Sequence, residues 1–228
     1  MQTHILGYPR IGSKRELKKA CEQYWSGKIL LEELLNTGRT LCNQNWNIQK
    51  EAGIDLIPCN DFSYYDQVLD MSLVVGAIPT RYHEVVLKKN NTELDLYFAM
   101  ARGYQKDGLD ITAMEMTKWF DTNYHYLVPE LAADQEFRYS SKATAAQVRE
   151  ALALGIATRP VVIGPLTFLR LAKRTDGYPV TYFNKADPDL FAKVIRQFQP
   201  QYQMSEIMAG IGTSNAASGT VPATHRRH

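Results

Sequence analysis

The 228-residue chain has few cysteines, almost no excess charge and few of the patterns that mark special classes of protein. Its three cysteines, Cys21, Cys42 and Cys59, are odd in number and far apart, with no Cys-x-x-Cys or His-x-x-x-His spacing. A disulfide framework and a zinc knuckle are therefore not indicated, because structural zinc needs three or four converging ligands. The net charge of +2 provides no field that would attract nucleic acid or a membrane surface.

Long apolar runs and nucleotide-binding motifs are also missing. No run of 18 apolar residues is present, and residues 1–7 lack the charged and then apolar arrangement of a signal peptide. The absence of a Gly-x-Gly-x-x-Gly fingerprint and of a phosphate-binding loop argues against a dinucleotide-binding fold or a nucleotide hydrolase. With 45% hydrophobic and 22% charged residues, the composition favours one large globular domain. We expect a cytoplasmic protein that acts on small molecules.

Apolar periodicity predicts strands and helices in alternation. Strands are expected at residues 4–8, 54–58, near 115, at 136–140 and at 159–165. Helices are expected from Ser13, with Glu16 completing a capping box, and at 28–50, after Asp66, around 94–101, at 144–154 and at 166–173. Residues 76–92 show no regular pattern. The alternation predicts a parallel βα architecture of about four to five units, part of an eight-stranded barrel.

Two segments combine charged side chains with aromatic rings or with backbone N–H donors. Residues 114–130 place Glu115, Lys118, Asp121, Asn123 and His125 among aromatic residues, which indicates either a ligand site or a strand and turn that satisfy their polar groups locally. The first helix opens with the cations Lys14, Arg15, Lys18 and Lys19. These cations form either an anion site, helped by the free N–H groups of the helix start, or a solvated basic face.

The segment after the strand at 54–58 is polar and aromatic. Asp61 and Asp66 follow the end of this strand, where parallel α/β folds bind ligands. An aspartate there is also a common helix cap, and this is the role we favour for Asp66. From residue 197 onward the chain has no clear period and little to bury, so we expect a domain at 1–200 and a disordered tail at 201–228.

Five segments, at residues 7–12, 15–20, 60–70, 114–130 and 160–167, carry a family resemblance. In this order they closely resemble the N-terminal domain of cobalamin-independent methionine synthases, the 5-methyltetrahydropteroyltriglutamate–homocysteine methyltransferases. The likeness spans residues 3 to about 195.

The resemblance implies a fold, a reaction and a set of contacts. The family has two (β/α)8 TIM-type barrels and uses zinc, without cobalamin, to hold homocysteine while it takes a methyl group from triglutamyl folate. The residues that match its folate contacts are Arg15, Glu16, Leu17, Lys18, Lys118 and Asn123; we call them the tail-contact residues. Because the oligoglutamate tail carries several carboxylates, the lysines and the arginine would donate charge-assisted hydrogen bonds. Glu16 and Leu17 would contribute backbone or shape.

The resemblance also implies what the chain lacks. In the family the zinc and homocysteine ligands lie in the C-terminal barrel, which has no counterpart in this sequence, and further barrel strands would follow residue 195. We therefore expect a truncated N-terminal part that is inactive by itself, with no catalytic or metal-binding residue of its own. A frameshifted or incompletely assembled gene is our hypothesis for the sequence beyond about residue 200. A non-catalytic binding module for oligoglutamyl folate and a non-functional gene remnant are the alternatives.

Overall fold

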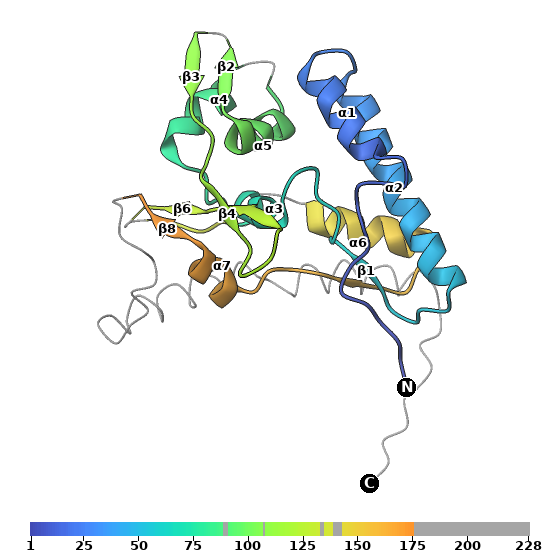
Figure 1. The fold of residues 1–228 in the computed structure, drawn as a ribbon. Helices are drawn as coiled ribbons and strands as arrows, with labels where there is room; N and C mark the ends of the chain where they lie inside the picture. The colour runs from blue at the N-terminus through green and yellow to red at the C-terminus, as the bar shows by residue number, and fades with distance from the viewer. Residues whose placement is uncertain (89–90, 107, 133–134, 139–142, 176–228) are drawn as a thin grey trace, which may run out of the picture.

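The computed structural model describes residues 1–88, 91–106, 108–132, 135–138 and 143–175 (Figure 1). Its helices are α1 (Glu16–Trp25), α2 (Leu31–Glu51), α3 (Gln67–Val74), the 3-10 turn η1 (Thr80–Tyr82), α4 (His83–Leu87), α5 (Glu93–Arg102), α6 (Ala143–Ala153) and α7 (Pro165–Leu171). Its strands are β1 (Ile57–Cys59), β2 (Tyr104–Lys106), β3 (Leu109–Ile111), β4 (Met116–Lys118), β5 (His125–Leu127), β6 (Glu130–Leu131), β7 (Thr158–Pro160) and β8 (Lys173–Arg174). The predicted tail at 201–228 lies outside the described residues.

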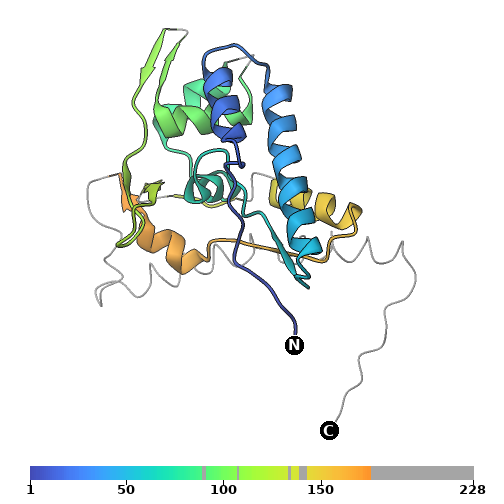
Figure 2. The same cartoon turned by 45° about the vertical axis from the view of Figure 1, so that its right-hand side comes forward.

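The two N-terminal helices lie side by side in both views (Figures 1 and 2). Helix α1 buries Leu17, Ala20 and Cys21, which recur at the predicted helical spacing. Helix α2 buries Leu34 and Trp46 among others, and the Trp46 indole donates to the Pro58 carbonyl at 3.1 Å. Both helices therefore turn apolar residues at helical spacing toward the core.

The start of α1 differs from the capping box that the sequence suggested. The helix begins at Glu16, and Arg15 holds the N-cap position with a φ of 62° and no side-chain cap. A turn closes from the Arg15 N–H to the Gly12 carbonyl at 3.1 Å, and the Glu16 carboxylate accepts from the Lys14 N–H at 2.9 Å. Gly12 has a φ of 81°, and a Cβ there would lie 2.2 Å from that carboxylate. The tight turn at 12–15 thus delays the helix past Ser13.

Parallel pairing joins segments that are distant in sequence. Strand β1 pairs with β7, with Ile57 opposite Thr158, and a parallel bridge joins His4 to Leu56. The predicted strand at 4–8 is reduced to that bridge. The predicted strand at 159–165 is shorter than expected and only partly buried, because β1 is its only partner among the described residues.

Antiparallel hairpins replace part of the predicted βα alternation. Strands β2 and β3 pair in one hairpin, and β4 and β5 pair in another, so the predicted strand near 115 does not belong to a βα unit. Residues 76–92 contain η1 and α4, and 135–138 contain no strand, which corrects two further expectations. The remaining pair, β6 and β8, is parallel.

The described strands form four two-stranded sheets. The α/β composition is confirmed, but the expected (β/α)8 barrel is not: no closed barrel is seen in the ranges given above. Within those ranges, no helix is both long and apolar enough to cross a bilayer.

Helix α3 lies between two apolar cores. Leu69 and Leu73 belong to the larger core with α1, α2 and α5, whereas Val68 and Met71 belong to a smaller core with β5 and α7. A helix that is apolar on opposite sides has to be buried between other elements. An interaction that holds α3 in place therefore supports the packing of both cores.

The Asp66 carboxylate fixes the start of α3. Asp66 is 1% exposed, and its Oδ2 accepts from the Leu69 N–H at 3.0 Å, which confirms its predicted role as a helix cap. The same oxygen accepts from the Leu127 N–H at 3.1 Å, and Oδ1 accepts from the Tyr124 hydroxyl at 3.2 Å. Burial raises the pKa of Asp66, while the N–H donors oppose that rise. One side chain thus joins α3 to the β4–β5 hairpin.

We predict that Asp66→Ala lowers the free energy of unfolding by about 3 kcal/mol, because it removes a cap and leaves buried donors unpaired. Urea denaturation measures this loss. The matched control is Thr92→Ala, which removes the cap of α5, where the Thr92 hydroxyl accepts from the Asp95 N–H. It should cost about 1 kcal/mol. Equal losses in the two variants would contradict the joining role of Asp66.

Candidate functional site

The tail-contact residues on α1 fall into two groups. Arg15 and Lys18 are exposed, and Lys18 pairs with Glu22 one turn along the helix at 3.6 Å. Leu17 is 1% exposed and packs in the core, and Glu16 closes the turn before the helix. Of these four residues, the two cations therefore have exposed side chains that a soluble anion could reach, Lys18 in competition with Glu22.

The other tail-contact residues lie on the β4–β5 hairpin. Lys118 ends β4 opposite His125, and Asn123 lies in the connecting turn; both are exposed. The turn is closed by the Trp119 N–H, which donates to the Tyr124 carbonyl at 2.7 Å. The segment 114–130 is thus a strand-turn-strand unit, which leaves room for both interpretations of its polar residues.

Helix α1 and the hairpin contact the same loop, residues 60–66. The Cys21 thiol lies 3.7 Å from the Tyr64 carbonyl, and the Tyr124 hydroxyl bonds Asp66. Arg10 braces the loop by donating to the Ser63 and Tyr65 carbonyls at 2.9 and 2.6 Å. No hydrogen bond or ion pair in the described part of the chain joins Lys18 to Lys118 or Asn123.

Among the residues that the structure describes, three other than glycine have a positive φ: Arg15 at 62°, Asn60 at 59° and Phe120 at 49°. They lie at the start of α1, in the shared loop and in the hairpin turn. Such backbone costs about 1–3 kcal/mol per residue and concentrates at functional sites. All three segments that surround the candidate site therefore contain locally strained backbone.

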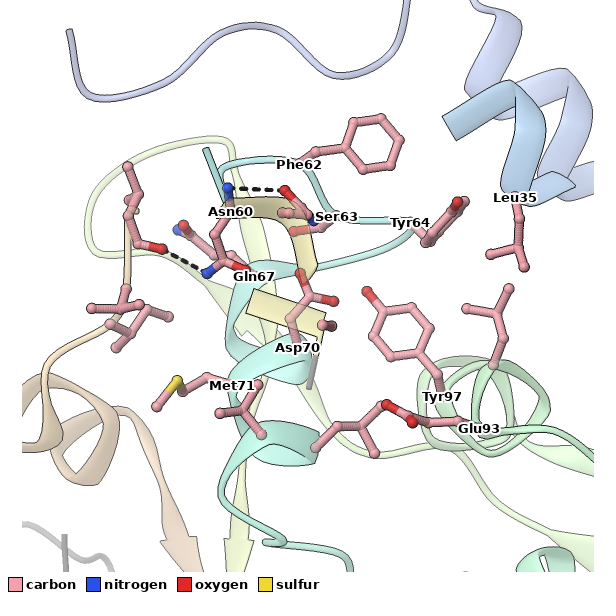
Figure 3. Close-up of a pocket in the computed structure, with 18 of the residues that line it drawn as sticks. Leu35, Asn60, Phe62, Ser63, Tyr64, Gln67, Asp70, Met71, Glu93 and Tyr97 are labelled. Atoms are coloured by element: carbon pink, nitrogen blue, oxygen red, sulfur yellow. Dashed lines mark hydrogen bonds between the residues drawn. The ribbon is translucent and has the colours of Figure 1, made fainter. Parts of the chain in front are cut away.

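A pocket of about 570 Å³ lies beyond the ends of β1 and β7 (Figure 3). It is lined by Asn60 and Phe62 from the loop after β1, by Asp70 and Met71 from α3, and by parts of α2, α5, α6 and the segment after β7. Asn60 is held there because its N–H donates to the Gln147 side chain at 2.9 Å and its side-chain amide donates to the Val161 carbonyl at 2.7 Å.

The Tyr64 ring forms part of the pocket wall because α2 has a glycine beneath it. A Cβ on Gly38 would lie 2.3 Å from the Tyr64 hydroxyl oxygen and 2.9 Å from the adjacent ring carbon. Any larger residue at this position would push the ring toward the pocket. The glycine in the middle of α2 therefore has a packing role.

Asp70 is the acid inside the pocket. It lies one turn after the Asp66 cap, and in Figure 3 its carboxyl group and the Tyr97 hydroxyl point toward each other from α3 and α5. Burial raises the pKa of Asp70 to about 7; hydrogen bonds to the Ser63 and Tyr97 side chains oppose this rise, nearby Asp66 adds to it, and Arg10 opposes it. A carboxyl group that titrates near neutrality can bind or exchange a proton at physiological pH.

None of the tail-contact residues lines this pocket. The sequence contained a signal for Asp70, since it is a lone acid in the apolar stretch of α3 and belongs to one of the family-like segments. Its neighbours from α2, α5 and α6 could not be identified from sequence, because the pocket is assembled from segments that are distant along the chain.

The described residues do not fit a zinc site. Burial raises the pKa of Cys21 and Cys59 to about 11 and that of Cys42 to about 12, so these thiols stay protonated, whereas zinc binds thiolates. No group of three or more potential ligands that could hold a metal ion occurs in the part of the chain that the structure covers.

Comparison with known proteins settles the family. Residues 2–207 match the family described as "Cobalamin-independent synthase, N-terminal domain". The chain belongs to this family.

Its relatives are named 5-methyltetrahydropteroyltriglutamate–homocysteine methyltransferase. That of Flavobacterium johnsoniae is 61% identical over 176 residues, which cover 77% of this chain and 22% of the relative. That of Cytophaga hutchinsonii is 58% identical over 77% of the chain and 23% of the relative, and that of Candida albicans is 45% identical over 90% and 28%. The chain therefore spans about a quarter of the length of the curated relatives it matches. The predicted family resemblance is confirmed.

We predict that Asp70 makes stability depend on pH. Its folded-state pKa of about 7 lies above the ordinary 3.8, so its contribution is fully present below pH 3.8 and is lost as the pH rises through 7. The loss is on the order of 2–4 kcal/mol. Urea denaturation from pH 4 to 8 should show the wild type falling relative to Asp70→Asn over this window. Parallel curves for the two proteins would contradict the shifted pKa.

Proposed function

We propose that this chain provides the folate-tail contacts of an enzyme that transfers a methyl group from 5-methyltetrahydropteroyltriglutamate to homocysteine. The proposal rests on the family and on the names of the relatives, which are about four times as long. A single observation carries the binding role: exposed cations stand on two segments, α1 and the β4–β5 hairpin, that contact one shared loop.

Arg15, Lys18 and Lys118 would bind tail carboxylates, and Asn123 would add an amide donor. The dipole of α1 suits the same ligand, since anions are stabilised at helix N-termini. Leu17 would act through its buried side chain by fixing the helix, and Glu16 by shaping the turn that presents Arg15. The strained backbone at Arg15 and Phe120 supports this placement.

The methyl-transfer step needs groups beyond those described. A homocysteine thiol is a poor nucleophile until its pKa is lowered, and zinc supplies that effect in the family. The departing folate nitrogen must also gain a proton from a general acid. Because the described residues do not fit zinc, we assign them no step of the reaction and expect no turnover by the chain alone. This lack of fit favours a non-catalytic oligoglutamyl-folate-binding module as the alternative.

We also propose that residues 1–200 form part of a (β/α)8 barrel, with residues 201–228 outside it. The parallel order His4, β1, β7 supports this, because consecutive barrel strands lie next to one another and are joined through helices. The hairpins β2–β3 and β4–β5 would then be insertions between two neighbouring barrel strands.

Titration calorimetry with triglutamyl and monoglutamyl 5-methyltetrahydrofolate tests the binding role. We predict that Lys18→Ala and Lys118→Ala each weaken triglutamyl binding about 10-fold, the loss expected for one charge-assisted hydrogen bond of about 1.5 kcal/mol. Affinity for the monoglutamyl form should change little, since it lacks most of the tail.

The matched control is Lys28→Ala, an exposed lysine beyond the far end of α1. It should leave both affinities unchanged. Equal wild-type affinity for the two folates, or equal losses in all three variants, would exclude tail recognition by these lysines. A turnover assay with homocysteine separates the alternatives, since methyl transfer by this chain would contradict the assignment of a binding role alone.

A further inference from the structure

The described lining of the pocket at the ends of β1 and β7 contains acids but no bases. Among its described lining residues, Asp70 and Glu93 are the ionisable acids, and none is Lys, Arg or His. Among the described residues, the cation that lowers the pKa of Asp70 is Arg10, whose guanidinium is already bonded to two loop carbonyls. An anionic ligand would therefore meet repulsion here, so the pocket does not suit a glutamate tail.

The rest of the lining suits an apolar or aromatic body. Phe62, Tyr64, Tyr97 and Trp119 contribute rings, and about half of the remaining lining residues are aliphatic. A volume of about 570 Å³ lies within the usual range of about 300–1,000 Å³ for small-molecule sites. A few polar groups set among apolar walls give such a site its specificity.

The polar groups meet at Asp70. The Ser63 and Tyr97 side chains lie close enough to the Asp70 carboxyl group to lower its pKa, and Gln67 lines the pocket one turn before it on α3 (Figure 3). Tyr97 is itself fixed, because its hydroxyl oxygen accepts from the Tyr65 and Asp66 N–H groups at 2.9 and 3.0 Å. Asp70 is thus a positioned acceptor in a largely apolar wall, and it remains partly open to the pocket.

We propose that this pocket binds a compact organic cation with an aromatic or apolar body, whose amidine-like or amine N–H groups pair with the Asp70 carboxylate. Glu93, exposed beside the pocket on α5, adds to the field that favours a cation. Aromatic walls favour the same charge through cation–π contacts. This site is separate from the tail-contact residues and does not depend on the proposed methyltransferase role.

The proposed pairing needs an ionised Asp70, so it should depend on pH. The charged or titratable groups around Asp70 are Arg10 from the N-terminal loop, Asp66 at the start of α3, Tyr97 from α5 and Tyr124 from the hairpin. Burial raises the pKa of Tyr124 to about 12 and raises the pKa of Tyr97 well above its usual value, so both phenols stay neutral. The Asp66 carboxylate is already engaged by the hydrogen-bond donors described above, so it does not face the ligand. Asp70 is therefore the group whose ionisation controls cation binding between pH 6 and 8.

Benzamidine is the probe for this test, with benzoate as its anionic match and benzamide as its neutral match. Ligand-observed NMR titration of the full chain at pH 8 should show saturable benzamidine binding, with a Kd of about 0.1–1 mM. Benzoate should bind at least about 10-fold more weakly. Asp70→Asn should weaken benzamidine binding about 10-fold or more, as expected for a lost charged hydrogen bond of about 1.5 kcal/mol.

Glu93→Gln is the matched control, because it neutralises the other lining acid; it should change the Kd less than Asp70→Asn does. Lys18→Ala should leave the Kd of benzamidine unchanged. If Asp70→Asn does not fold, the wild-type pH series decides, since the affinity should rise several-fold from pH 6 to 8. Absence of saturable binding, equal affinity for benzoate, an unchanged Kd in folded Asp70→Asn, or a flat pH series would each overturn the proposal.

Discussion

The buried carboxylate of Asp66 is the contact on which the described structure most depends. It caps α3 and at the same time receives the Leu127 N–H and the Tyr124 hydroxyl from the β4–β5 hairpin. Because α3 separates the two apolar cores, this carboxylate determines how the cores meet. It also positions Asp70, one turn later on the same helix. A single capping interaction thereby links the hairpin, both cores and the pocket.

Positively and negatively charged side chains lie in different places around the shared loop at 60–66. The cations Arg15, Lys18 and Lys118 are exposed, where water screens them and where they can meet a flexible polyanion. Asp70 instead lies in the wall of the pocket, where none of the described lining residues is a base. Burial makes such a charge costly, which is why the pKa of Asp70 rises toward neutrality. The same loop therefore borders an exposed cationic region and an acidic pocket that favour different ligands.

The errors in the sequence-based fold have physical causes. Ser13 has the composition of a helix cap, but the turn from Gly12 to Arg15 takes its place. The strand near 115 was recognised, yet its partner β5 is a hairpin neighbour, and strand propensity does not specify a partner. The helix α4 was missed because it is short and packs through few apolar positions, so it has little periodic signal. The helices with clear periods, α1, α2 and α6, appeared close to where they were predicted.

The family, the long helices, the capping role of Asp66 and the segments that contain the exposed cations could be predicted from the sequence. These features are encoded locally, in periodicity, in turn chemistry and in the order of short motifs. The folded chain was needed to show that α1 and the hairpin contact one loop, and that Asp70 faces Tyr97 in a pocket whose described lining has no base. The reason is that burial and charge complementarity arise between residues far apart along the chain. No local pattern records which of them become neighbours.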